Sequence, residues 1–420
     1  MHTPRSTYAS RGAAVLRHLT TRVAVDVRRR ENIAFGVLAI VLLVVFPLVF
    51  DVFRLNLIGK YLTYAFVALG LVLCWGYGGI LSLGQGVFFG LSGYCMAMFL
   101  KLEASDPAST SIQSTPGIPD FMDWNQITAL PAFWVPFKSF VFTLIAVPVV
   151  PGVLAFVLGT AMFRRRVGGV YFAIITQAVA SILSILIIGQ QGYTGGVNGI
   201  TDLKTLHGWD IRTDMAKRIL YCVNAVLLLG AVALSLSIVR SKLGRLLVAL
   251  RDKEERVLFT GYDVASIKTF VFVLAAIYAA IGGAMFTLQV GFMSPSFVGI
   301  VPSIEMVIAA AVGGRASLFG AIYGSLLVNF GKTYFSESFP ELWLFVIGAM
   351  FIVVVIALPN GLAGLDLRSF ATRLVLRAQG IRNRDASGPK LVTGPAASKD
   401  DPKLPPNGAG ASGDAGASHA

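Results

Sequence analysis

Long blocks of hydrophobic residues, separated by short polar stretches, run through most of the chain. Residues 61–100 carry no charge at all. Because a helix needs about 20 apolar residues to cross the hydrocarbon core of a bilayer, this block has room for two spans. Similar blocks recur up to Pro359. The pattern predicts an all-helical, polytopic integral membrane protein with about ten transmembrane helices.

Ten spans are expected from these blocks. The short block at 303–314 ends in two glycines before Arg315, so we expect a broken or re-entrant helix there, which is tolerated only where protein or water lines it. The estimated spans are 33–50, 58–75, 84–101, 138–162, 168–189, 219–239, 269–290, 303–314, 318–335 and 342–358.

The composition agrees with a membrane protein. The chain is 55% hydrophobic and 14% charged, whereas soluble domains carry about 25% charged residues. A net charge of +13 would suggest a nucleic-acid partner for a soluble protein, but in a membrane protein the distribution of charge reports orientation. We therefore expect a multi-pass membrane protein that contacts lipid and binds no nucleic acid.

The basic residues are unevenly distributed. They gather as seven arginines before Asn32, the triplet Arg164–Arg166, seven Lys and Arg between Arg240 and Lys268, Arg315, and eight after Asp366. Since Lys and Arg favour cytoplasmic loops, we expect these clusters and both termini in the cytoplasm and the acidic loop 103–137 outside. The loop 191–218 does not fit, because it carries four basic residues and yet falls outside.

Three regions are expected. Residues 1–32 form a basic cytoplasmic arm, residues 33–365 a transmembrane domain, and residues 366–420 a cytoplasmic tail. The tail is rich in Gly, Ala, Ser, Pro, Asp and Lys, a composition typical of largely disordered segments. The transmembrane domain includes the external loop 103–137 and a cytoplasmic segment at 240–268.

Candidate motifs for catalysis or cofactor binding are incomplete in this sequence. Gly331-Lys332-Thr333 resembles the end of a phosphate-binding loop, but Leu326 occupies the position of the leading glycine. The four histidines are scattered, and the three cysteines lie in apolar runs without ligand spacing. We therefore expect no enzyme, and no metal or cofactor bound by this chain.

The cytoplasmic segment 241–268 is amphipathic. Six of its apolar residues recur at helical spacing and form one face, six consecutive charges follow at Arg251–Arg256, and Gly261 offers a helix stop. Such an element can dock on a soluble partner or lie on the lipid surface, and the residues alone leave both open. The apolar residues are Leu243, Leu246, Leu247, Leu250, Val257 and Leu258.

The same segment, from Arg251 through Gly261 to Val264, resembles the coupling motif of ATP-binding-cassette (ABC) importer permeases in the branched-chain amino acid permease family. Glu254 and Gly261 keep the seven-residue spacing of that motif, whereas Arg256-Val257 replace its usual alanine pair. The resemblance implies a short helix seated in a groove of a cytoplasmic ATPase. The residues implied in coupling are Arg251, Asp252, Glu254, Glu255 and Gly261.

Three further segments resemble the same family in the same order along the chain, so the resemblance covers roughly residues 58–365. The first matches the break between its second and third spans, the second its threonine–glycine–glycine signature, and the third its C-terminal half. They are Gly78–Gly86; Gly168–Thr176 with Thr194–Ile200; and Gly282–Met285 with Ser294–Ser296, Ser303–Glu305 and Gly313–Gly320.

Within the family, four features look most like the permease of urea and short-chain amide importers: Pro119–Trp124 with Leu130–Trp134, Arg315, Asn329, and Ser336–Pro340. Urea or a short-chain amide is therefore the expected solute, and a branched-chain amino acid is the alternative. An alternative from another class is an ion-coupled secondary transporter, which would need an intramembrane carboxylate.

The resemblance also implies the partners. They are a homologous second permease, two cytoplasmic ATP-binding subunits that bind and hydrolyse the ATP, and an extracytoplasmic solute-binding protein. This chain would form half of the translocation path and couple ATP hydrolysis to alternating access.

Polar groups inside apolar spans are costly and are expected to face protein or a water-filled path. Each candidate also has a structural explanation, because a polar side chain can satisfy backbone groups freed at a glycine-rich break or join two helices. For Glu305 the structural explanation is a first-turn position in a helix capped by Ser303. The candidates for the path are Ser82, Gln85, Thr176, Gln177, Thr194, Asn198 and Glu305.

Overall fold

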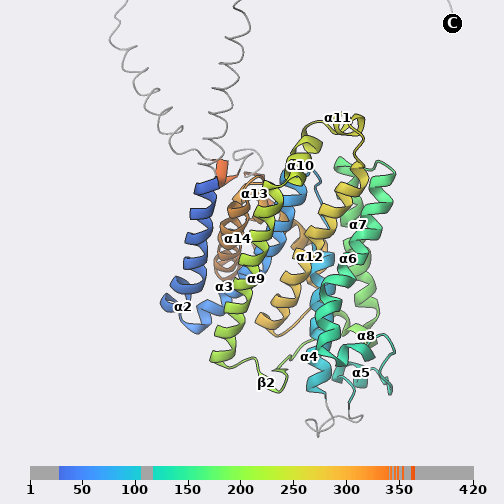
Figure 1. Ribbon diagram of the computed structural model, residues 1–420. Coiled ribbons are helices and arrows are strands. Elements are labelled where there is room, and N and C mark those ends of the chain that lie inside the picture. The colour runs from blue at the N-terminus through green and yellow to red at the C-terminus, as the bar shows by residue number, and fades with distance from the viewer. Residues whose placement is uncertain are drawn as a thin grey trace, which may run out of the picture. The chain divides into compact units, whose positions relative to one another are not determined.

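A computed structural model describes residues 28–105, 117–339 and short pieces between 341 and 364. All of them belong to one compact unit that ends at Leu365. The expected span 342–358, most of the basic arm 1–32 and the tail 366–420 lie wholly or largely outside the described residues. Within those residues the protein is a bundle of helices, with one small hairpin of two strands of two residues each. This architecture confirms the all-helical prediction (Figure 1).

Seven helices in the described part of the chain are long and apolar enough to cross a membrane. Each overlaps an expected span, and most extend a few residues beyond it. They are the helix Arg28–Val49, which includes α2 (Phe46–Val49); α3 (Val52–Leu71), continued as a π-helical turn to Tyr77; α4 (Gln85–Ala104); α6 (Phe140–Arg164); α7 (Gly169–Gly189); α9 (Asp214–Arg240); and α12 (Val264–Val290).

Two further helices complete the described bundle. The helix α13 (Ile300–Gly313) has only 14 residues, which agrees with the short block expected there, and α14 (Leu318–Ser338) follows after a tight turn. Short elements occupy the ends of the bundle. They are α5 (Asp120–Trp124), α8 (Gln191–Thr194), α10 (Lys242–Asp252), α11 (Glu254–Phe259), β1 (Thr205–Leu206) and β2 (Trp209–Asp210).

Side-chain caps fix where several helices begin. A Ser, Thr or Asp at the N-cap accepts a hydrogen bond from an otherwise unpaired backbone N–H of the first turn. The caps are Ser139 for α6, Thr213 for α9, Ser241 for α10, Asp263 for α12 and Ser317 for α14.

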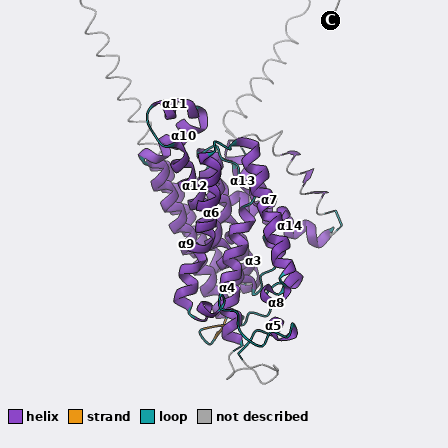
Figure 2. Ribbon diagram, turned by 90° about the vertical axis from the view of Figure 1, so that its right-hand side faces the viewer, coloured by secondary structure: helices purple, strands orange, loops and turns teal. Residues whose placement is uncertain are grey.

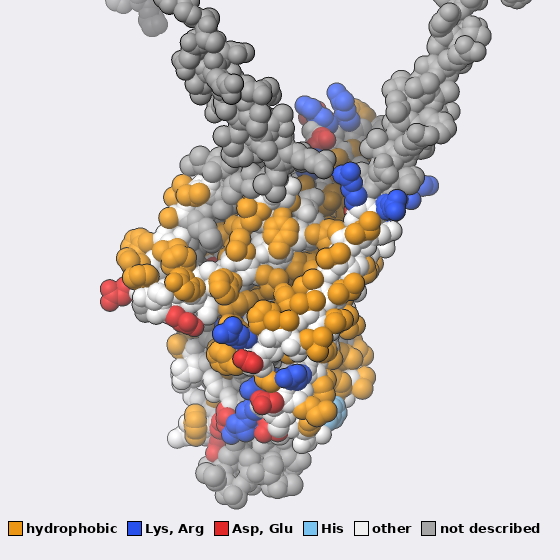
Figure 3. Space-filling view, turned by 90° about the vertical axis from the view of Figure 1, so that its left-hand side faces the viewer, with side chains coloured by type: hydrophobic (Ala, Val, Ile, Leu, Met, Phe, Trp, Pro, Cys, Tyr) orange, Lys and Arg blue, Asp and Glu red, His pale blue; other side chains and the backbone are white. Residues whose placement is uncertain are grey.

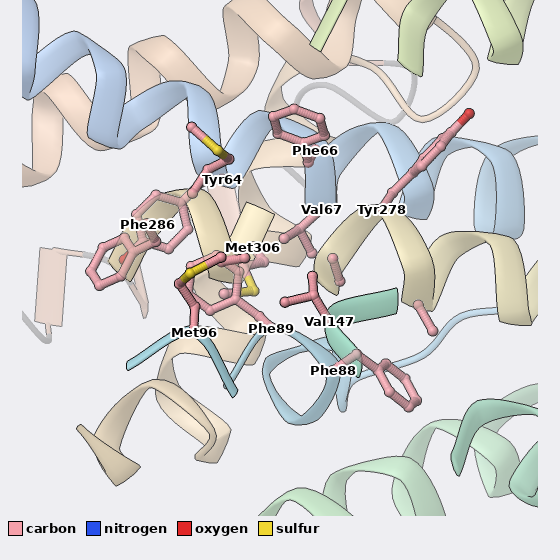
Figure 4. Packing of buried hydrophobic residues seen from close by; sticks show 14 of the residues in the cluster. Tyr64, Phe66, Val67, Phe88, Phe89, Met96, Val147, Tyr278, Phe286 and Met306 are labelled. Carbon is pink, nitrogen blue, oxygen red and sulfur yellow. The ribbon is translucent and has the colours of Figure 1, made fainter. Parts of the chain in front are cut away.

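The helices α3, α4 and α12 form the centre of the bundle. Most residues in the apolar stretch of each of these helices are buried. The Tyr64 and Phe89 rings stack with centroids 5.5 Å apart, and Phe286 packs edge-on against both (Figure 4). At Gly283 the helices α12 and α4 approach so closely that an added Cβ would overlap the backbone oxygen of Phe89. Small residues therefore set the distance between these helices.

The outer helices bury much less of their surface. In the most apolar 18-residue stretch of each helix, only 6% of the residues of Arg28–Val49 and 28% of those of α7 are buried, compared with 83% for α4. The exposed residues of these helices are predominantly Val, Ile and Leu, and hydrophobic side chains gather across the middle of the face shown in Figure 3. This surface suits contact with lipid or with a second membrane protein.

The two ends of the bundle differ in character. Helices α10 and α11 form one end, and α5, α8 and the hairpin form the other (Figures 1 and 2). The Arg240 guanidinium pairs with Glu31 at 2.8 Å, which places the start of the first helix beside the end of α9. The first described residues therefore lie at the same end as α10.

The loop 191–218, which did not fit the charge rule, balances two of its basic residues locally. Lys204 pairs with Asp202 at 2.6 Å and Arg212 with Asp210 at 3.3 Å. The hydrogen bond from Lys204 lowers the pKa of Asp202, and the backbone N–H of Arg212 lowers that of Asp210. These pairs reduce the charge that the basic residues present at this end.

Candidate functional site

The amphipathic segment that begins at Ser241 contains two short helices, α10 and α11, rather than one. The helix α10 ends at Asp252, Lys253 adopts an extended conformation (φ −151°, ψ 87°), and α11 begins at Glu254. Five of the six expected apolar residues face inward and are buried or partly buried, whereas Leu258 is 41% exposed. The expectation of a single continuous apolar face was therefore wrong at Leu258, because the break at Lys253 turns α11 relative to α10.

The turned end of α11 exposes aromatic side chains. Phe259 is 91% exposed and Tyr262 is 50% exposed. Gly261 has φ +85°, a conformation that L side chains rarely adopt, so it ends α11 as the sequence predicted. Glu255 is exposed, and Glu254 pairs with Lys268 at 2.7 Å. This outward surface combines charges with three exposed hydrophobic side chains, of which Phe259 is the most exposed.

Arg251 joins this segment to the transmembrane core. Its guanidinium donates to the carbonyl of Gly76 at 2.8 Å and to Asp252 at 3.1 Å. The Arg251 side chain also lies against Gly79, where φ is +70°. Gly76 lies in the last turn of the π-helical segment that follows α3, and its Cα packs on the backbone of Arg315. The segment therefore contacts the start of the glycine-rich break directly.

Asp263 fixes the point at which the chain re-enters the bundle. Its carboxylate accepts hydrogen bonds from the backbone N–H groups of Ala265 and Ser266 at 3.1 and 3.3 Å, and from the Ser266 hydroxyl. The hydrogen bond from the Ser266 hydroxyl is the main reason that the pKa of Asp263 lies below its ordinary value. The charged carboxylate thus stabilises the first turn of α12.

The glycine-rich break before α4 is closed by two of the candidate residues. The Ser82 hydroxyl accepts from the Gly84 N–H at 3.4 Å, and the Thr176 hydroxyl accepts from the Leu83 N–H at 3.1 Å. Thr176 also donates to Ala173 O within its own helix. Both hydroxyls are buried. They satisfy backbone N–H groups freed by the break, so these two residues have a structural role.

Gln85 differs from these two. Its side chain is fully buried, and neither amide atom has a hydrogen-bond partner within the described residues. A buried primary amide without partners costs free energy. Gln177, on α7, is partly exposed.

The expected capping by Ser303 is wrong. The helix α13 begins at Ile300 with Gly299 as its N-cap, so Ser303 lies inside the helix. The Ser303 hydroxyl instead accepts from the Gly86 N–H at 3.1 Å and donates to Gly299 O, which ties α13 to the start of α4. Glu305 pairs with Lys332 of α14 at 2.5 Å, and its side chain is only 11% exposed.

Thr194 and Asn198 lie in the loop after α7. The Thr194 hydroxyl donates to the carbonyls of Ile187 and Gln190 and so closes the end of α7, whereas Asn198 is exposed. Three glycines of this loop have positive φ, which L side chains rarely adopt: Gly195, Gly196 and Gly199.

The aromatic residues of the loop between α4 and α6 divide into two pairs. Phe121 and Trp134 are buried, and Trp134 donates to the carbonyl of Tyr193 at 3.0 Å. Trp124 and Phe133 are 79% and 57% exposed. The described part of the chain contains no group of three His, Cys, Asp or Glu side chains that could hold a metal ion.

Comparison with known proteins identifies the family. The family described as branched-chain amino acid transport system / permease component matches residues 53–355. The chain belongs to this family. It is therefore a multi-pass protein of the bacterial inner membrane and a permease subunit of an ABC importer, not an enzyme, because ATP hydrolysis belongs to partner subunits.

The permease has several curated relatives. It is 26% identical over 363 residues to the high-affinity branched-chain amino acid transport system permease protein LivM of Escherichia coli K12, which covers 81% of this chain and 76% of the relative. It is also 26% identical to LivH of the same strain over 143 residues, or 33% of this chain and 45% of the relative. BraD of Pseudomonas aeruginosa is 27% identical over 147 residues, or 35% and 47%. No solved structure matches the permease.

These relatives bear on the expected solute. All three are named for branched-chain amino acids, so the findings favour the alternative solute over urea or a short-chain amide. The resemblance to the branched-chain amino acid permease family itself is confirmed. In general, the family implies a partner permease, an ATPase and a binding protein.

Three polar residues near Glu305 were missed in the sequence. Lys332 was considered only as part of a failed phosphate-loop motif. Ser181 and Ser184 follow Gln177 at helical spacing, so the four- and seven-residue offsets would have revealed a polar stripe on α7. These residues line a groove with Glu305.

Proposed function

We propose that this permease forms one half of the translocation path of an ATP-driven importer, with a branched-chain amino acid as the first candidate solute. The contact of Arg251 with Gly76 O carries the proposal, because it connects a cytoplasmic surface to the glycine-rich break in the core. Membership of the permease family supports the same function.

The proposed coupling runs from α11 inward. Arg251, Asp252, Glu254, Glu255 and Gly261 form or support the outward surface, and Phe259 projects from its end as the largest exposed hydrophobic side chain of α11. When an ATPase pair closes, α10 and α11 move with it, and Arg251 transmits that movement to Gly76 and Gly79. The break then shifts the start of α4, where Gln85 is buried.

Two observations support a homologous second permease as partner. The permease is similar to both LivM and LivH, two permease proteins of E. coli that are named for the same kind of transport system. The outer surface of α7 and the helix Arg28–Val49 is apolar and largely exposed, as a helix interface within a membrane requires.

We also propose that α10 and α11 face the cytoplasm, with both termini on that side. The triplet Arg164–Arg166 at the end of α6 and the six charges from Arg251 lie at the same end of the bundle as the first described residues. This arrangement agrees with the preference of Lys and Arg for the cytoplasmic side.

Among the path candidates, Gln85, Gln177 and Glu305 are retained as side chains that could meet the solute. Ser82, Thr176 and Thr194 hold backbone groups, so we assign them to the shape of the path. Asn198 is exposed at the external end and is placed at its entrance. The pairing of Glu305 with Lys332 weakens the case for an ion-coupled secondary transporter, because the carboxylate already has a cationic partner.

Urea or a short-chain amide is the second candidate solute. The observation that favours it is the aromatic external loop, in which Trp124 and Phe133 are exposed. These side chains can anchor the loop at the membrane interface or contact a solute-binding protein.

Uptake of labelled leucine and labelled urea, in cells with and without the gene, tests the solute. Loss of leucine uptake alone supports the first candidate, and loss of urea uptake alone assigns the permease to the second. If neither changes, the importer function is contradicted for both solutes. A variant with Phe259→Ser, which retains the fold because the side chain is exposed, is expected to reduce uptake of the transported solute.

A further inference from the structure

An open groove of about 550 Å³ lies beside α7, α13 and α14. One wall is α7, which contributes Ser181, Ser184 and Ile185. The opposite wall includes Phe297 and the first turns of α13, followed by Glu305 and Lys332. The groove thus combines an apolar lining with two hydroxyls and an ion pair.

The groove lies deep within the bundle's apolar region. Ser181 is about 12 Å along α7 from its end at Gly189, at 1.5 Å per residue. The side chains of Gln177, Ser181 and Ser184 lie on one face of this helix, and all three are partly exposed. Ile182, directly beside them in sequence, is 64% exposed and lies off this stripe. The rest of α7 is almost entirely hydrophobic.

Such a polar stripe is unsuited to lipid. Ionisable residues at this depth are expensive against hydrocarbon and normally face protein or a water-filled cavity. Glu305 and Lys332 are 2.5 Å apart, and the Lys332 side chain is 35% exposed. The groove therefore needs water, a solute or another protein subunit to cover its polar residues.

The lining matches one class of solute. A small α-amino acid with an aliphatic side chain carries an ammonium, a carboxylate and an apolar group. Glu305 offers an acceptor for the ammonium, Lys332 a donor for the carboxylate, and Phe297 and Ile300 an apolar surface.

We infer that this groove is the wall that the permease contributes to the solute path, and that it recognises a zwitterionic α-amino acid through Glu305 and Lys332. The second permease closes its open side. As the solute enters, its ammonium and carboxylate replace the two partners of the ion pair, so that neither buried charge is left alone. The inference rests on the proposed function and adds Lys332, Ser181 and Ser184 to the path.

Thiol labelling tests whether the groove holds water. Cys74 and Cys95 are buried, so a variant with Cys222→Ser has no native thiol that the reagent can readily reach and serves as the background. In membrane vesicles of both orientations, Ser181→Cys and Ser184→Cys are expected to react with a charged methanethiosulfonate at least tenfold faster than Ile182→Cys, and leucine should slow them. Equally slow reaction at all three positions would overturn the inference.

Charge variants test recognition. Glu305→Gln and Lys332→Gln are expected to lower the maximal rate of leucine uptake at least tenfold at normal membrane levels. Asp202→Asn and Lys204→Gln remove an external ion pair as matched controls and should leave uptake unchanged. The double swap Glu305→Lys with Lys332→Glu restores the ion pair with the charges exchanged, so it should keep a normal membrane level and still fail to recover uptake.

Other outcomes separate this inference from the proposed function. Recovery of leucine uptake by the double swap would show that the pair is only structural. Loss of urea uptake with normal leucine uptake in Glu305→Gln would assign the groove to a neutral amide and overturn the zwitterion. If the wild-type importer moves neither solute, the proposed function has failed before the groove is tested.

Discussion

At the scale of single residues, glycines allow helix backbones of this permease to approach one another closely. Gly283 brings α12 against the backbone of Phe89 in α4, with no room for a Cβ. Gly230, in α9, has open space around its Cα. Two helical glycines in apolar spans therefore have opposite tolerance to substitution.

Gly283→Ala is expected to destabilise the permease, because the backbone of Phe89 cannot move aside as a side chain would. Overpacking of this kind costs about 1–3 kcal/mol. Gly230→Ala is the matched control and should be neutral or stabilising by up to about 1 kcal/mol, from helix propensity. Thermal melting of the purified permease in detergent measures both. Equal melting temperatures for the two variants would contradict the packing described here.

Arg251→Gln is expected to uncouple ATP hydrolysis from transport, since it removes the charge-assisted hydrogen bond to Gly76 O. Such bonds contribute about 1.5–3 kcal/mol, and partial exposure of Arg251 places this one at the lower end. In the assembled importer, uptake per ATP hydrolysed should fall severalfold. Arg245→Gln removes an exposed charge from the same helix and should not change this ratio.

At the scale of elements, the long hydrophobic blocks located the helices well, because a helix that crosses a bilayer requires a long apolar run. The expected span 269–290 and the observed α12 end at the same residue, but α12 begins at Val264, where Asp263 caps it. A backbone role for Ser82 was one of the explanations that the sequence left open. The partners of Thr176 and Ser303 could not be predicted, because they are backbone groups distant in sequence. The Glu305–Lys332 pair joins residues on two helices, a contact that spacing along one helix cannot reveal.

Gly261→Pro is expected to abolish uptake while leaving membrane insertion intact. Proline fixes φ near −65°, which is incompatible with φ +85° at this position, so α11 cannot end as observed. Glu254→Arg should have a similar effect, because it replaces the Lys268 ion pair with repulsion. Normal uptake by both variants, at normal membrane levels, would rule out coupling through this segment.

The N-cap of α12 predicts a pH dependence. Because the folded-state pKa of Asp263 is lowered, its charge stabilises the fold fully above the ordinary Asp pKa of about 3.9. This contribution is lost as the pH falls through the lower folded-state pKa. Asp263→Asn should therefore melt below the wild type at pH 7, with the difference shrinking under strong acid. A constant difference down to pH 3 would contradict the charge-based cap.

At the scale of the whole molecule, a buried centre of α3, α4 and α12 is combined with sparsely buried outer helices. The segment of α10 and α11 contacts this centre at Gly76, and the groove beside α7 is open at the surface of the bundle. An importer built from two such permeases would place the groove at their interface and the coupling segments against the ATPases. Movement of the segment of α10 and α11 would then be linked to the groove through the buried centre.

The central claim is that ATP hydrolysis by partner subunits drives solute through this permease. The most direct measurement is leucine uptake into proteoliposomes that contain the complete importer, with ATP enclosed and ionophores present to collapse all ion gradients. We predict uptake that requires ATP and is lost when this permease is omitted or carries Gly261→Pro. Uptake that proceeds without ATP, or that the ionophores abolish, would contradict the account.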